Sequence, residues 1–229
     1  VRRKRDSCPR ATIAFDAQGY ALAHLQFVSL WDGEGLTPFF QPIVRLADEH
    51  ILAFEALARS SLPGLENPGA MFQIAKQHNA EADLSSLLRE VSLELARPLW
   101  SDYVIYLNTH PAEMNGRELF ESLDDLRSQF PEAPIVLEVH EAGVASIRFL
   151  GELKQKLTEL NVQLAYDDFG TGQSRLIALA EVSPDIVKFD MELIRGLQNA
   201  SGKRLRMIRS LLNMVKSLNA VSIAEGVEE

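Results

Sequence analysis

The sequence contains a single cysteine, Cys8, which excludes a disulfide framework and a thiolate metal cluster and fits a reducing, cytoplasmic compartment. No apolar run approaches the roughly 20 residues that a membrane helix needs. The start of the chain also lacks the apolar core of a signal peptide. No glycine-rich dinucleotide turn and no P-loop follows any strand-like run, which argues against a bound nucleotide cofactor.

Basic residues are scarce as well: 23 Lys and Arg stand against 32 Asp and Glu, giving a net charge of -9. This balance argues against a nucleic-acid polymer as partner, because neutralising many phosphates requires clustered Lys and Arg. A phosphate ester could still bind if a metal held by carboxylates offset its charge. The same acid excess also fits an ordinary acidic surface.

Hydrophobic patterning predicts an alternation of strands and helices after an N-terminal tail and a lead-in helix over 21–31, which together occupy residues 1–35. Strands are predicted at 39–44, 51–57, 104–108, 135–141, 162–168, 186–190 and from 221 onward. Helices are predicted at 68–98, 111–129, 147–160, 174–181 and 191–218, the last of them broken near 201–202.

The first two strands are separated by residues 45–50, a gap too short for a crossover helix, so this pair is expected to be antiparallel. From the second strand on, the alternation with short joints predicts a parallel sheet covered by helices. A closed barrel and a doubly wound open sheet both satisfy this pattern.

Polar side chains stand where the predicted strands end: Glu55, Asn108, Glu138, Asp167 with Asp168, Lys188 and Glu225. Each acid alone has a simpler explanation as a turn or a helix cap, and Lys188 as a surface lysine. In a parallel barrel, however, the carboxyl ends of all strands meet at one face. Several carboxylates gathered there would repel one another unless cations lay between them, which predicts a magnesium or manganese site. Two such ions about 4 Å apart would favour attack of water on a phosphorus ester.

These positions lie within ordered motifs that resemble those of the EAL domain family over roughly residues 36–229. The motifs are Gln41-Pro42-Ile43, Glu55-Ala56-Leu57 with Arg59, Asn108, Glu138 followed by Glu141, Asp167-Asp168-Phe169-Gly170-Thr171-Gly172, Lys188 with Asp190, and Ala224-Glu225-Gly226-Val227-Glu228. The resemblance implies an α/β fold, a modified TIM-type (β/α)8 barrel with an antiparallel first strand. It also implies a phosphodiesterase that hydrolyses cyclic di-GMP to linear pGpG with two Mg²⁺ or Mn²⁺ ions.

Carried over position by position, the resemblance implies metal ligands at Glu55, Asn108, Glu138, Asp167 and Asp168. It implies that Lys188 and Glu225 position or deprotonate the attacking water, and that Glu141 anchors the loop after Asp168. Gln41, Leu57 and Arg59 are implied to contact the substrate, with Arg59 at a phosphate. We also expect a homodimer by analogy, and a regulatory domain or membrane anchor could lie outside this chain.

The sequence departs from the family pattern in several places. His140 stands where a threonine is common, Gln173-Ser174-Arg175 replaces a Tyr-Ser-Ser run, and Thr109-His110-Pro111 replaces a serine-containing turn. The eighth strand with its Gln-Gly-aromatic motif is missing after Glu229, so we expect a C-terminally truncated barrel domain. The strand-like residues 11–15 lead into residues 16–20, which contain Gln-Gly-Tyr, so residues 11–20 could fill the eighth position, although chance explains this match more simply.

Two alternative functions stay open at this point. The first is a catalytically weak or inactive receptor that binds cyclic di-GMP and passes a signal to a partner; the missing strand and the altered loop after Asp168 favour it. The second is a structural dimerisation module that binds no dinucleotide.

Overall fold

The computed structural model describes residues 25–33, 35–114, 116–140, 146–170 and 176–227. Residues 25–31 are helical, as predicted for the lead-in helix, and the remainder of that prediction lies outside the described residues. None of the helices in the described part of the chain combines the length and the hydrophobicity needed to span a membrane.

One curled sheet organises the fold, and its strand order follows the chain order. The strands are β1 (Phe39–Val44), β2 (Ile51–Leu57), β3 (Val104–Asn108), β4 (Ile135–His140), β5 (Gln163–Phe169), β6 (Ile186–Phe189) and β7 (Val221–Ala224). β1 pairs with β2 in antiparallel orientation, and each later strand pairs with the one before it in parallel. Both sequence predictions about strand direction are therefore confirmed.

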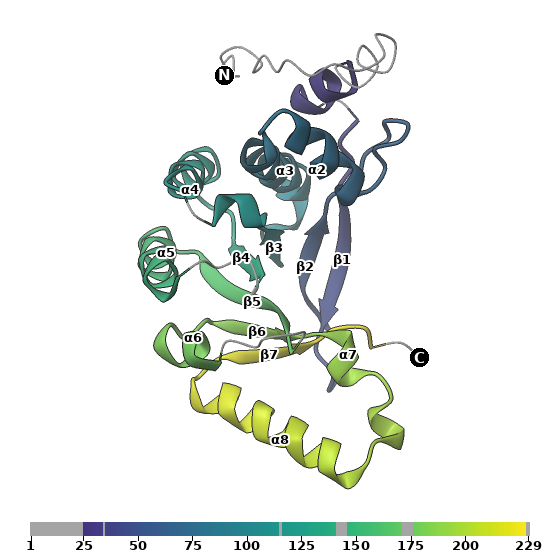
Figure 1. Ribbon diagram of the computed structural model, residues 1–229, viewed down its shortest axis with the longest axis vertical. Helices are drawn as coiled ribbons and strands as arrows, with labels where there is room; N and C mark the ends of the chain where they lie inside the picture. Colours follow the sequence, from purple (N-terminus) through teal and green to yellow (C-terminus); the bar gives the residue numbers. More distant parts are fainter. Residues whose placement is uncertain (1–24, 34, 115, 141–145, 171–175, 228–229) are drawn as a thin grey trace.

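Helices lie along the convex side of the sheet, from α3 at one end to α8 at the other (Figure 1). The α-helices are α2 (Pro68–Gln77), α3 (Glu81–Ala96), α4 (Glu118–Gln129), α5 (Ile147–Glu159), α6 (Leu176–Glu181), α7 (Met191–Ile194) and α8 (Gly202–Ser217). Short 3-10 helices occur at η1 (Arg97–Leu99), η2 (Pro111–Glu113) and η4 (Leu197–Asn199).

Two helix predictions were too long. The helix predicted over 68–98 is split into α2 and α3, because Asn79 between them has a left-handed backbone with φ of 52°. The helix predicted over 111–129 begins instead with η2, and α4 starts only at Glu118. The break predicted near 201–202 is confirmed: Ser201 caps α8 by accepting a hydrogen bond from the Arg204 amide.

Side chains of the strands alternate between two cores, because successive residues of a strand point to opposite faces. The outer face joins the helices in the larger core, with Leu137, Val139 and Phe189 among its members. The inner face has a smaller apolar layer: Ala53, Tyr106, Val136, Ala165 and Ile186. The polar residues described below form the next layer along the inner face of the sheet, adjacent to this apolar layer.

The described strands form a half-barrel, with which a TIM-type barrel is consistent. The missing eighth strand and the domain boundary near residue 35 remain predictions. Residues 11–20, considered as a substitute strand, lie outside the described residues.

Candidate active site

Lys188 is the centre of the polar cluster that the sequence predicts, and its side chain is only 2% exposed. Its ammonium nitrogen lies 3.0 Å from Glu55 Oε2, 2.8 Å from Glu138 Oε1, 2.9 Å from Asp167 Oδ1 and 2.7 Å from Glu225 Oε1. Side chains from β2, β4, β5, β6 and the end of β7 thus meet in one place. The interpretation of Lys188 as a surface lysine is wrong, and the predicted convergence of the strand ends is confirmed.

The alternation of the strands explains this convergence. Glu55, Glu138 and Lys188 each follow, by two positions, a residue of the inner apolar layer on the same strand. They consequently form the next layer toward the carboxyl ends of the strands, which is where barrel sites lie. Asn108 stands level with Glu138 in the β3–β4 register and donates its side-chain amide to Glu55 Oε1 at 3.2 Å.

A bulge in β5 allows two adjacent acids to serve the same site. Tyr166 pairs with Val187 and Phe169 pairs with Phe189, so β5 has one more residue than β6 over this stretch. Asp168 has a φ of 55°, which is uncommon for a residue other than glycine. In a regular strand, Asp167 and Asp168 would point to opposite faces. Here oxygens of both acids and of Glu225 lie within 4.8 Å of one another.

Burial and mutual repulsion disfavour the charged forms of the carboxyl groups at the site. Burial raises the pKa of Glu138 well above its ordinary value, even though Lys188 opposes that shift. Burial also raises the pKa of Glu225, and burial together with the neighbouring Asp167 raises the pKa of Asp168. For Lys188, burial favours the neutral form, but the surrounding carboxylates outweigh burial and raise its pKa. One ammonium therefore does not offset the negative charge gathered here.

The donor set fits hard divalent cations. Both carboxylate oxygens of Glu138 and Oδ1 of Asp167 are buried without a hydrogen-bond partner, although Lys188 is within ion-pair distance. We attribute the difference to direction: an ammonium shared by four carboxylates cannot point a proton well at each of them. Buried carboxylate oxygens with unsatisfied lone pairs, next to the amide of Asn108, are the ligands that Mg²⁺ and Mn²⁺ prefer.

Two of the three residues predicted to contact substrate come from β1 and from the segment that follows β2. Gln41 stands directly opposite Glu55 in the β1–β2 register and is exposed. Arg59 is half-buried, with its guanidinium carbon 5.6 Å from the centre of the Phe39 ring. Glu141 lies outside the described residues.

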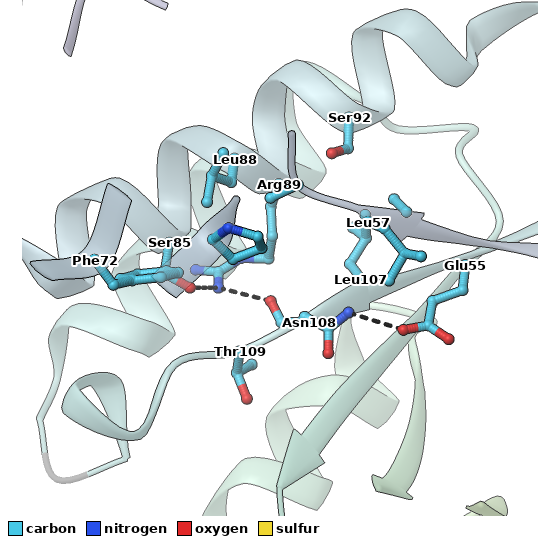
Figure 2. A pocket seen from close by; sticks show the side chains of 13 residues that line it. Glu55, Leu57, Phe72, Ser85, Leu88, Arg89, Ser92, Leu107, Asn108 and Thr109 are labelled. Carbon is cyan, nitrogen blue, oxygen red and sulfur yellow. Dashed lines mark hydrogen bonds between the residues drawn. The ribbon is translucent and has the colours of Figure 1, made fainter. Parts of the chain in front are cut away.

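A cavity of about 290 Å³ opens beside Glu55 and Asn108, between β2, β3 and the helices α2 and α3 (Figure 2). Its lining is largely apolar: Ala56, Leu57, Ala58, Pro68, Phe72, Leu88 and Leu107, with Ser85, Arg89, Ser92 and Thr109 as polar members. Leu57, one of the predicted substrate contacts, belongs to this wall. The volume lies just below the lower bound of about 300 Å³ for small-molecule sites, and the mostly apolar lining with a few polar groups has the character of such sites.

Sequence reasoning missed two features of the site. The first is a contact of 2.9 Å between His140 Nε2 and Asp168 Oδ2, which the inner-face alternation could have indicated because His140 follows Glu138 by two positions. The second is a buried ion pair between Arg89 and Glu113 behind Asn108. Nothing in the local pattern of either residue indicates that pair.

Comparison with known proteins agrees with the geometry. The family model described as EAL domain matches residues 28–229. The chain is 28% identical over 202 residues to the Escherichia coli (strain K12) protein named probable cyclic di-GMP phosphodiesterase PdeG, covering 84% of this chain and 40% of that protein. The chain therefore spans less than half the length of this relative.

Solved structures share the fold. An EAL domain protein from Listeria monocytogenes EGD-e superposes with a TM-score of 0.76 at 22% identity, covering 94% of this chain and 85% of that one. The manganese and cyclic di-GMP complex of Klebsiella pneumoniae BlrP1 at pH 6 gives a TM-score of 0.73 at 27% identity, covering 86% of this chain and 50% of that one.

Proposed function

We propose that this chain, which belongs to the EAL domain family, binds cyclic di-GMP and hydrolyses it to linear pGpG at the carboxylate cluster around Lys188. The observation that carries the proposal is the convergence of four carboxylates on one buried ammonium, beside a cavity suited to a small molecule. The relatives support it: PdeG is named a probable cyclic di-GMP phosphodiesterase, and BlrP1 was solved with manganese and cyclic di-GMP.

Two divalent ions, Mg²⁺ or Mn²⁺, would be held by Glu55, Asn108, Glu138, Asp167 and Asp168. When bound, they would supply Lewis-acid polarisation of the phosphodiester and activation of water. Buried Glu138 gains most from such partners, because its oxygens have no hydrogen bond in the described part of the chain.

Lys188 and Glu225 handle the proton and the developing charge. Lys188, kept protonated by its neighbours, holds a water or a phosphoryl oxygen in place. Glu225, whose pKa burial raises, accepts one proton as the water oxygen bonds to phosphorus. The bond from phosphorus to the ribose O3′ breaks, and O3′ takes up that proton, so pGpG keeps a 5′-phosphate.

The remaining predicted residues would bind the dinucleotide. Arg59 would pair with a phosphate that is not cleaved, and Gln41 would approach the substrate from β1 opposite Glu55. Leu57 would pack against a base in the cavity, where an apolar wall excludes water. Glu141 would anchor the loop after Asp168.

Product analysis tests the proposal. Purified protein incubated with cyclic di-GMP and Mn²⁺ or Mg²⁺ should release pGpG, detected by chromatography and mass spectrometry, and Glu55→Ala should abolish the product. Arg97→Ala, which removes an exposed ion pair with Glu94, is the matched surface control and should retain full activity. Calorimetric binding of cyclic di-GMP without product would establish a receptor instead of an enzyme. Absence of both binding and product would refute the proposal.

A further inference from the structure

A bidentate ion pair lies buried between α3 and η2. Arg89 and Glu113 have side chains that are 2% and 1% exposed, and their atoms are 2.6 Å apart (Nη2 to Oε1) and 2.9 Å apart (Nη1 to Oε2). Arg89 also donates to the hydroxyls of Ser85 and Ser122, each at 3.0 Å, so the guanidinium is fixed from α3 and from α4. Because an apolar pair of similar size is often as stable as a buried ion pair, stability alone does not explain this arrangement.

Both members of the pair also hold the backbone that follows β3. Arg89 Nη1 donates to the main-chain carbonyl of Asn108 at 3.4 Å. Glu113 Oε2 accepts a hydrogen bond from the backbone amide of His110 at 2.9 Å. The pair therefore fixes the main chain on both sides of Thr109, and Figure 2 shows Arg89 reaching the carbonyl of Asn108.

Asn108 and Thr109 are also held by hydrogen bonds to Glu55 and Glu138 of the carboxylate cluster. The amide nitrogen of Asn108 donates to Glu55 Oε1 at 3.2 Å. Thr109 donates from its backbone amide at 3.1 Å and from its hydroxyl at 2.8 Å to the carbonyl of Glu138. With its nitrogen directed to Glu55, the side-chain oxygen of Asn108 is the atom left for a cation. The orientation of that oxygen thus depends on how the backbone of Asn108 is held.

We propose that Arg89 and Glu113 form a positioning pair that orients Asn108 as a cation ligand and thereby sets the affinity of the site for divalent ions. This inference rests on the proposed function, because it takes Asn108 as a ligand. Partners one step removed from a metal ligand typically change metal affinity by about 10- to 100-fold when they are removed. An effect of that size is expected here.

The test measures Mn²⁺ affinity without substrate, from the electron paramagnetic resonance signal of free Mn²⁺. The double variant Arg89→Met/Glu113→Leu should keep a cooperative thermal transition, yet bind Mn²⁺ about 10-fold more weakly or worse. Arg89→Lys keeps the charge but loses the bidentate hydrogen bond to Glu113. The Mn²⁺ affinity of this variant should therefore lie between those of the wild type and the double variant. If the double variant does not fold, Arg89→Lys alone carries the comparison.

Two controls separate positioning from general stability. Arg127→Met removes a guanidinium that donates to the carbonyls of Phe130 and Ala133 on the α4–β4 connection and to that of Asn161 between α5 and β5; it should lower the thermal midpoint and leave Mn²⁺ affinity unchanged. In an Asn108→Ala background, replacing the pair should have no further effect on affinity, because the oriented ligand is gone.

The outcomes are distinguishable. Wild-type affinity in both the double variant and Arg89→Lys would overturn the positioning role while leaving the proposed function intact. An equal loss of affinity in Arg127→Met would also overturn it. Failure of the wild-type protein to bind Mn²⁺ would instead overturn the proposed function, and the inference with it.

Discussion

Replacing Lys188 by methionine removes the only ammonium that the described residues place among Glu55, Glu138, Asp167 and Glu225. At separations of 2.7–3.0 Å and an effective dielectric constant of about 20, each contact is worth about 6 kcal/mol of gross attraction. The net value is much smaller, because burial already penalises every charge involved. Breaking a buried ion pair from one side costs roughly 3–5 kcal/mol. With four partners, we expect Lys188→Met to cost about 5 kcal/mol at pH 8 in metal-free protein.

The cost should depend on pH in a defined direction. Lys188 opposes the upward shift in the pKa of Glu138, so without the ammonium the carboxyls of the cluster keep a proton up to a higher pH than in wild-type protein. A raised carboxyl pKa means that the folded state binds more protons than the unfolded state, so stability falls as pH rises through that window. The destabilisation by Lys188→Met should therefore shrink on acidification, by about 1.4 kcal/mol per pH unit for each extra proton.

Urea unfolding at pH 5, 6, 7 and 8 in the presence of a chelator measures this dependence. Lys156→Met is a matched control: its ammonium lies 2.6 Å from Asp124, whose side chain is 52% exposed, so removing it should cost about 0.5 kcal/mol without pH dependence. A cost for Lys188→Met below about 1 kcal/mol would refute the reasoning. So would a cost that is larger at pH 5 than at pH 8.

The remaining predictions concern neighbouring positions. Gly170→Ala should destabilise the protein by about 2 kcal/mol in urea unfolding, because φ is 107° there and an added methyl would overlap Leu193; Gly196→Ala, with open space around it, should cost less. Burial raises the pKa of Tyr106 to about 12, so one phenol should titrate late in an ultraviolet pH titration, and Tyr106→Phe should remove that step. Because the folded Tyr106 retains its proton, its contribution to stability is complete below pH 10 and should decline by up to about 3 kcal/mol between pH 10 and 12. A titration of the wild-type protein in which every phenol titrates near pH 10 would contradict this.

Much of the architecture could be predicted from sequence because its signals are local. The short joint between β1 and β2 settled their direction, and the alternation of strand-like and helical runs settled the rest of the sheet. The polar residues at strand ends could be assigned to one place because parallel strands share a carboxyl edge. That expectation required no knowledge of distances, and the contacts of Lys188 agree with it.

Other features depend on backbone conformation or on distant partners. The split between α2 and α3 follows from one left-handed residue, Asn79, and an Asn inside a helical pattern is only a weak indication of such a break. The bulge at Asp167 and Asp168 depends on the pairing of β5 with β6, which no local pattern reveals. Arg89 and Glu113 each resemble solvent-facing charges on a helix, and only packing across 24 positions buries them together.

Charge at the site also links binding to folding. Glu138 is buried and carries unsatisfied oxygens, so in metal-free protein part of the folding free energy is used to hold like charges together. A cation that binds only the folded chain adds stability in proportion to the logarithm of its concentration, about 2.7 kcal/mol at 100 times its dissociation constant. The same ions would also replace unfavourable contacts among Glu138, Asp167 and Asp168 with favourable ones. Divalent ions should therefore stabilise the folded chain before any substrate is present, and Lys188 should keep the cluster assembled in their absence.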